Sequence, residues 1–344
     1  MWHALKHGYL LDFATARPYP RRESSILTAR TDRRVPIYDQ HYHPWPGCPR
    51  PRWLRWTVIT RYHLRGLFES KGRNGLILLL LIAGVIQLVF LMMIYLSANK
   101  SILDTYGISA SQLVPIDNRF FLYPIMYESL IIGFLTLIVG SGLIADDRRD
   151  NAIPLYLSKP LTPLEYLLGK FGVVAFFVLA ITAVPVNFLF VFEVLTDGGW
   201  AFLKKYWWLP FSITSLSLAV TAVCGSIILL ASSLVKKGAI AAVIVIGLFV
   251  GHNVMVGVIE SSLGVSRLKI LSIQFNLHGL GLWLFGVRDA PELQFYGFSG
   301  PQAALVLLAL VAVCWVVLWW RVRPEPIPWN RSDDCRKSKP VSVS

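Results

Sequence analysis

The stretch Gly75–Leu96 reads GLILLLLIAGVIQLVFLMMIYL, and Gln87 is its one strongly polar residue. A helix crosses the hydrocarbon layer of a bilayer with about 20 consecutive apolar residues, so this stretch predicts a membrane-spanning helix. Five more runs of the same kind follow at Phe121–Ala145, Phe171–Phe192, Leu209–Val235, Gly238–Ile259 and Ala303–Trp320. The sequence therefore predicts an all-α polytopic membrane protein whose six transmembrane helices occupy residues 75–320, with a kink or break near Pro185 in the third.

The segments that flank the spans differ from them in composition. Residues 1–51 are polar and rich in Arg and Pro, which predicts a disordered cytoplasmic arm. Residues 52–71 predict a helix in the headgroup region, because tryptophans and aliphatic residues share one face and arginines the other; an ordinary cytosolic helix is the alternative. The run Ile270–Phe285 is short and rich in glycine, so it predicts interfacial or re-entrant helices before the last span. Residues 321–344 predict a cytoplasmic tail.

Charge gives the predicted bundle an orientation. The net charge is +13, and the positive residues lie in tails and short loops, which suits an anionic membrane face better than nucleic acid. Of the 33 Lys and Arg residues, 26 fall in the two tails and in the loops after the second and fourth spans, and 7 fall on the other side. Because cytoplasmic loops carry the excess of Lys and Arg, both termini are predicted to be cytoplasmic.

The sequence predicts no bound cofactor or metal. Cys48, Cys224, Cys314 and Cys335 lack metal-ligand spacing, and free thiols are expected. The 344 residues contain no Gly-x-x-x-x-Gly-Lys-Ser/Thr phosphate loop. If the protein uses ATP, a separate polypeptide must therefore bind it.

The loop between the second and third spans, residues 146–170, is the most informative polar stretch. It opens with a charged turn, DDRRD at 146–150, and continues with a short amphipathic segment that Pro160 and Pro163 would stop. A second short helix with Glu165 and Lys170 is expected to lead into the third span. Such a platform between two spans could pass a push from a soluble partner into the bundle. A solvated loop without that role fits the same pattern.

Two motifs in this loop, LSKP at 157–160 and EYLLGK at 165–170, resemble the corresponding loop of the permease subunits of type-2 ABC exporters. The resemblance extends over about residues 53–320. It implies that the loop is a coupling helix that docks on an ATP-hydrolysing subunit, which would hold the ATP and Mg. The residues expected to make or support that contact are Asp146, Asp147, Arg149, Leu155, Tyr156, Leu157, Pro160 and Glu165.

The same resemblance implies the oligomeric state and the membrane in which the protein lies. Two ATPase copies need two permease copies, so a homodimer or a paired heterodimer is expected in the inner (plasma) membrane of a bacterial cell. Val35-Pro36-Ile37-Tyr38-Asp39-Gln40 is similar to the opening Met-Pro-Ile-Tyr-Asp-Gln of a subgroup described as multicopper-enzyme-maturation permeases. Val35 is then a candidate valine-coded start, with residues 1–34 outside the native protein; a genuine long arm is the alternative.

A few polar residues within the predicted spans are candidates for a substrate path. Glu128 is a carboxylate inside the second span, and His252 and Asn253 lie in the fifth. Intramembrane ionisable groups are costly and usually face a bundle or a cavity, although bonding to neighbouring helices explains them equally well. The rival functions are a membrane-embedded enzyme that uses Glu128, Glu193 and His252, and an ion-coupled secondary transporter. Because no nucleophile–base motif joins the three, an enzyme is not expected.

Overall fold

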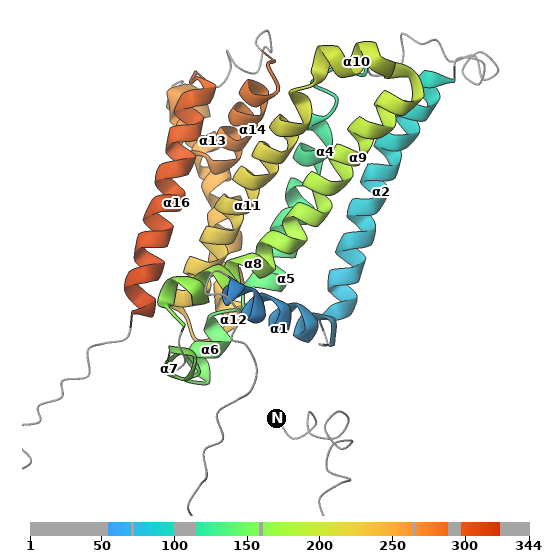
Figure 1. The fold of residues 1–344 in the computed structure, drawn as a ribbon. Coiled ribbons are helices and arrows are strands. Elements are labelled where there is room, and N and C mark those ends of the chain that lie inside the picture. Colours follow the sequence, from blue (N-terminus) through green and yellow to red (C-terminus); the bar gives the residue numbers. More distant parts are fainter. Residues whose placement is uncertain are drawn as a thin grey trace, which may run out of the picture. The chain divides into compact units, whose positions relative to one another are not determined.

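The computed structural model describes residues 54–69, 72–99, 115–157, 161–263, 266–287 and 297–323. Every regular element in these ranges is helical (Figure 1). The predicted arm at 1–51, the candidate start at Val35, Pro160 and almost all of the predicted tail at 321–344 lie outside the described residues.

The helices follow one another in a simple order along the chain. The first half contains α1 (Trp56–Glu69), α2 (Arg73–Ala98), α4 (Leu122–Tyr127), α5 (Ser129–Gly140), α6 (Ala145–Arg149), α7 (Ile153–Leu157), α8 (Pro163–Ile181) and α9 (Ala183–Glu193). The second half contains a π-helical turn η3 (Val194–Gly198), α10 (Gly199–Tyr206), α11 (Leu209–Leu234), α12 (Gly238–Ile246), the π-helical turn η4 (Gly247–Gly251), α13 (His252–Leu263), the 3₁₀ turn η5 (Ser266–Leu271), α14 (Ile273–Leu284) and α16 (Gly300–Val322).

Six helical segments in the described residues are long and apolar enough to cross a membrane, which confirms the predicted spans. They are Arg73–Ala98, Ser129–Arg149, Pro163–Thr196, Leu209–Leu234, Gly238–Ile259 and Gly300–Val322. The helix predicted at 52–71 is present as α1, and η5 with α14 supplies the short helices predicted before the last span.

Breaks between helices occur at Glu128 and at Thr182. Glu128 separates α4 from α5, although its carbonyl oxygen still accepts a hydrogen bond from the N–H of Ile132 at 2.8 Å. Thr182 separates α8 from α9, three residues before Pro185. Proline has no N–H to donate and its ring crowds the carbonyl one turn earlier, which explains a break at this place and confirms the predicted kink.

The start of the third span differs from the prediction. A separate short helix with Glu165 and Lys170 was expected before this span, and that expectation is wrong, because α8 runs without interruption from Pro163 to Ile181. Pro163 occupies the first turn, where a helix tolerates proline. Thr162 and Glu165 form a capping box, in which the Glu165 N–H donates to Thr162 Oγ1 at 3.2 Å and the Thr162 N–H donates to Glu165 Oε2 at 2.7 Å.

The α11 helix forms the centre of the bundle. It contacts α5, α8, α9, α12, α14 and α16. In its most apolar 18-residue stretch, 67% of the residues are buried, against 17% in that of α2 and 11% in that of the span from Gly238 to Ile259. The apolar side chains on the outer helices therefore remain available to lipid or to another membrane subunit.

The two ends of the bundle carry different elements. At one end lie α1, α6, α7, the turn between α11 and α12, and the end of α16, at the bottom of Figure 1. We call this the α7 end. The opposite end carries α10 and the start of α16 (Figure 1). The 146–170 loop and the positive residues of α1 therefore share the α7 end.

Candidate coupling site

The segment from α6 to α7 projects from the α7 end and returns to the bundle at α8. α5 ends at Gly140, and a turn leads into α6. Asn151 then adopts a positive φ of 50°, a left-handed conformation that asparagine tolerates better than most residues. This residue turns the chain between the two short helices, so that α7 lies beside the start of α8 and is not an extension of α6.

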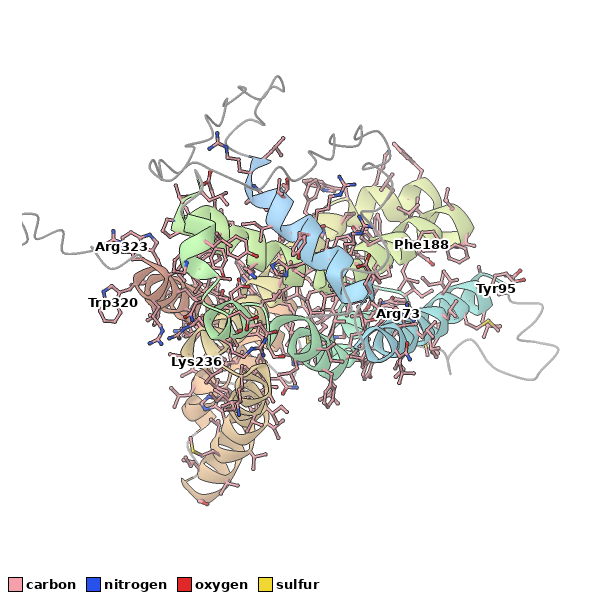
Figure 2. All side chains as sticks on the ribbon, turned by 90° about the horizontal axis from the view of Figure 1, so that it is seen from below. Arg73, Tyr95, Phe188, Lys236, Trp320 and Arg323 are labelled. Carbon is pink, nitrogen blue, oxygen red and sulfur yellow. The ribbon has the colours of Figure 1, made fainter. Side chains whose placement is uncertain are left out.

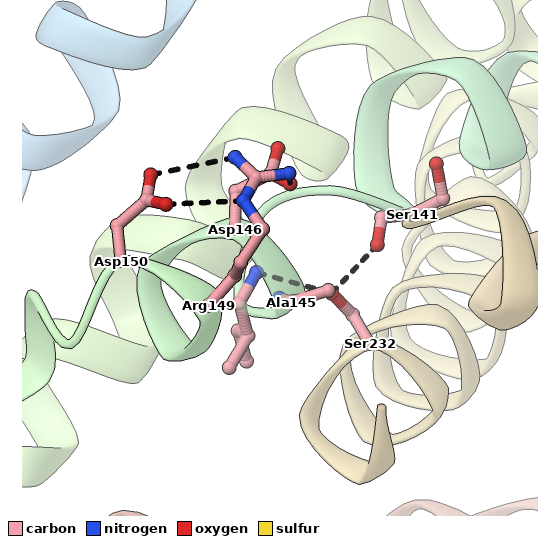
Figure 3. A network of polar contacts seen from close by, with 7 residues as sticks. Ser141, Ala145, Asp146, Arg149, Asp150 and Ser232 are labelled. Carbon is pink, nitrogen blue, oxygen red and sulfur yellow. Dashed lines mark hydrogen bonds and ion pairs between the residues drawn. The ribbon is translucent and has the colours of Figure 1, made fainter. Parts of the chain in front are cut away.

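Ser232, near the end of α11, fixes the start of this segment (Figure 3). Its hydroxyl oxygen accepts hydrogen bonds from the N–H groups of Ile144 and Ala145 at 3.0 and 2.9 Å and donates to the carbonyl oxygen of Ser141 at 2.8 Å. The first N–H groups of a helix have no partner within that helix. The buried Ser232 hydroxyl satisfies two such groups next to α6 and ties the segment to the central helix.

A buried ion pair joins α6 to α8. Lys170 Nζ is 2.6 Å from Asp147 Oδ2, and the Lys170 side chain has no exposed surface. Nζ also donates to the carbonyl oxygen of Leu143 at 2.6 Å and lies 2.8 Å from His63 Nε2. A lysine ammonium has three N–H groups and no acceptor, so these three contacts use its full capacity. The hydroxyl of Tyr166 donates to the same Asp147 oxygen at 2.6 Å.

The contact with the Lys170 ammonium determines the tautomer and the protonation of His63. Because the ammonium only donates, His63 Nε2 must accept, which places the ring proton on Nδ1. Burial and the neighbouring Lys170 charge lower the pKa of His63 from 6.5 to about 4. His63 is therefore neutral at neutral pH, as the hydrogen bond requires. We call Asp147, Lys170, His63 and Tyr166 the anchor network.

The α1 helix joins this arrangement through close packing on α8. Thr60 Oγ1 donates to the carbonyl oxygen of Gly169 at 2.8 Å. A Cβ placed on Gly169 would lie 2.7 Å from the Cβ of Ile59 and 2.9 Å from the carbonyl oxygen of Trp56, closer than real contacts allow. Glycine is thus required for α1 to cross α8 beside the anchor network.

The outer surface of the segment is exposed and carries a different set of charges. Arg149 pairs with Asp146 and Asp150, with N–O distances of 3.0 Å to each, and all three side chains are more than half exposed (Figure 3). On α7 the Leu155 side chain is 67% exposed, whereas the Tyr156 ring packs against Tyr166 with centroids 5.5 Å apart.

The predicted docking residues therefore fall into three groups. Asp146, Arg149 and Leu155 lie on the outside, where a partner can reach them. Asp147 belongs to the buried anchor network, and Tyr156 packs against the Tyr166 ring of that network. Glu165 is engaged in the capping box of α8. The Leu157 side chain and the whole of Pro160 lie outside the described positions.

The candidate substrate-path residues make two separate sets of contacts. Glu128 is fully buried and accepts a hydrogen bond at Oε1 from Gln87 Nε2 on α2 at 2.7 Å. His252 Nε2 lies 2.8 Å from the carbonyl oxygen of Leu271, and Asn253 Nδ2 donates to Gln274 Oε1 at 3.0 Å, both contacts to η5 and α14. These contacts do not gather the acid and the imidazole into one catalytic cluster. No group of three or more metal-ligating side chains was found among the described residues.

Six apolar spans with an exposed, anchored segment at one end are the architecture of a multi-pass membrane protein. The chain belongs to the ABC-2 family of transporters, because the profile described as ABC-2 family transporter protein matches residues 73–321, from α2 almost to the end of α16. The protein is therefore a multi-pass membrane permease of that family. A comparison with curated proteins gives no significant match.

Proposed function

We propose that this chain is the permease subunit of an ATP-driven ABC exporter and that the segment from α6 to α7 couples it to a separate ATPase subunit. One observation carries the proposal: an exposed segment is fastened by the anchor network and by Ser232 to three other elements, α1, α8 and α11. A push on α7 would reach these helices through short polar contacts.

The contacts that fasten the segment resist separation. The Asp147–Lys170 pair is almost completely shielded from water, and a buried pair that loses one partner costs about 3–5 kcal/mol. A Cβ on Gly238, at the start of α12, would lie 3.2 Å from the backbone of Gly142. The start of α12 thus lies close to the turn before α6, and a movement of α7 would carry these elements with it.

The partners of the proposed exporter follow from its family and from what the chain lacks. Because the sequence has no phosphate loop, ATP and Mg would be bound by the ATPase subunit. A second permease copy, identical or related, would complete the complex in the inner membrane of a bacterial cell. Both termini and the α7 end would face the cytoplasm, in agreement with the distribution of Lys and Arg.

Two finer assignments also belong to this proposal. The multicopper-enzyme-maturation subgroup is supported by the similarity at residues 35–40, which precede the matched residues 73–321. The substrate path would pass Glu128, His252 and Asn253. Since Glu128 is fully buried beside Gln87, neighbouring helices would have to move before a substrate could reach it.

The coupling role is tested by replacing Leu155 and Leu157 together with Asp and by purifying the complex with its co-expressed ATPase. Burial of each leucine in a partner groove would contribute about 1.5–3 kcal/mol before ordering costs. We expect the double variant to insert into the membrane and to lose the ATPase and its substrate-stimulated hydrolysis. The matched control, Leu155→Ile with Leu157→Ile, keeps the apolar surface and should keep the partner. If the Asp variant retains both partner and stimulation, the segment is not the coupling element.

A further inference from the structure

Four basic residues lie at the α7 end, on α6, on the turn between α11 and α12, and in the last turn of α16. Arg148 donates a hydrogen bond to the carbonyl oxygen of Ser233, at the end of α11, directly before the turn that carries Lys236 and Lys237. Arg321, in the last turn of α16, lies near enough to Arg148 for their positive charges to repel. We call Arg148, Lys236, Lys237 and Arg321 the basic cluster.

The three acids next to Arg148 in sequence are engaged elsewhere. Asp146 and Asp150 pair with Arg149, and Asp147 pairs with Lys170 in the anchor network. Within the described ranges no carboxylate forms an ion pair with a member of the basic cluster. Like charges held close together favour the binding of an anion.

The neighbouring side chains place this cluster at the depth of lipid headgroups. The Arg323 guanidinium lies 3.5 Å from the centre of the Trp319 ring, and Trp320 is 74% exposed. Tryptophans favour the boundary between hydrocarbon and water. Seen from the α7 end, Trp320 and Arg323 lie on the same side of the bundle as Lys236, whereas Arg73 lies on another side (Figure 2).

We propose that the basic cluster binds the phosphate of an anionic phospholipid from the leaflet at the α7 end. Arginine matches phosphate oxygens with paired N–H groups, and polybasic clusters beside spans of this kind attract anionic headgroups. Each cation there contributes roughly a fivefold preference for an anionic over a zwitterionic lipid. Because Arg148 belongs to α6, the bound lipid would hold the segment next to α11 and α16 and would make coupling sensitive to the lipid mixture.

The test counts lipids bound to the purified full chain by native mass spectrometry, with phosphatidylglycerol and phosphatidylcholine of equal chain length. Lys236→Gln with Arg321→Gln removes two cations and leaves the Arg148–Ser233 hydrogen bond in place. We expect phosphatidylglycerol affinity to fall about 25-fold, as two such cations predict, with phosphatidylcholine unchanged. The matched control, Arg61→Gln with Arg73→Gln, removes two exposed cations elsewhere and should change affinity less than twofold.

Several outcomes would overturn the proposal. An equal loss in both double variants would mean that only diffuse surface charge attracts the lipid. The basic cluster is not a site for anionic lipid if the unaltered protein binds the two lipids equally. The same conclusion follows if the Lys236→Gln, Arg321→Gln variant keeps full phosphatidylglycerol binding. Loss of the co-expressed ATPase with lipid binding intact would assign the cluster to a protein partner. Melting of both variants, monitored by intrinsic fluorescence, identifies any loss of folding.

Discussion

Replacing Asp147 by Asn should destabilise the protein by about 3–5 kcal/mol, the cost of leaving one member of a buried ion pair alone. The structure places this variant in that range because the Lys170 side chain has no exposed surface and would lose the carboxylate that pairs with it at 2.6 Å. Asn keeps the size of Asp and can still accept the Tyr166 hydroxyl, so shape is not the cause of the loss.

Two further variants separate charge from general damage. Asp147→Asn with Lys170→Met removes both charges, and such replacements are often close to neutral, so most of the stability should return. Asp146→Asn breaks a pair whose side chains are about half exposed and should cost less than about 1 kcal/mol. Reversible unfolding of the purified protein in micelles, followed by tryptophan fluorescence, measures all three.

The double variant also tests the mechanical role. It should bind the ATPase, because the exposed residues of α6 and α7 are unchanged, but it should transmit less stimulation, because α6 has lost its ion pair with α8 and keeps the hydrogen bond from Tyr166. The reasoning is refuted if Asp147→Asn costs less than about 1 kcal/mol. It is also refuted if the double variant is as unstable as the single one.

Three other predictions address neighbouring features. The pKa of His63 is about 4 in the fold against an ordinary 6.5, so stability should be constant above pH 6.5 and fall by about 2 kcal/mol by pH 5, and His63→Gln should flatten that dependence in melting curves. Gly169→Ala should cost about 1–3 kcal/mol through overpacking against α1, whereas Gly133→Ala, with nothing within 4 Å, should not; equal melting of the two would contradict the packing. Glu128→Gln should melt above Glu128→Leu, because only the amide still accepts the Gln87 N–H and an unpaired buried donor costs about 1–3 kcal/mol; the reverse order would argue against that hydrogen bond.

The apolar runs predicted the spans well because each run is a local property of the chain. Gly75–Leu96 contains a single strongly polar residue, and α2 covers all of it. The kink near Pro185 was equally local, since it depends on a missing N–H. The start of the third span was wrong, because Thr162 and Glu165 cap α8 early and make one helix where two were expected. The charged turn expected at 146–150 is also largely helical, since α6 covers Ala145–Arg149.

The candidate site was less predictable because its contacts join distant residues. Asp146 and Asp147 are equivalent in the sequence, yet the first faces water and the second pairs with a lysine on another helix. His63 and Ser232 carry no local signal that they would meet this loop. One clue was present: Lys170 stands directly before a long apolar run, and a lysine at that place needs a partner.

The interrupted third span has a mechanical consequence. The 19 residues of α8 extend about 28 Å, and their first turns are fastened to α1 and α6. If a push at α7 tilted this rod by about 10°, its far end at Ile181 would move by about 5 Å. The break at Thr182 would then work as a joint, so α9 need not follow the full displacement. The break near Pro185 would thus determine how much of a displacement at one membrane face is transmitted to the other face.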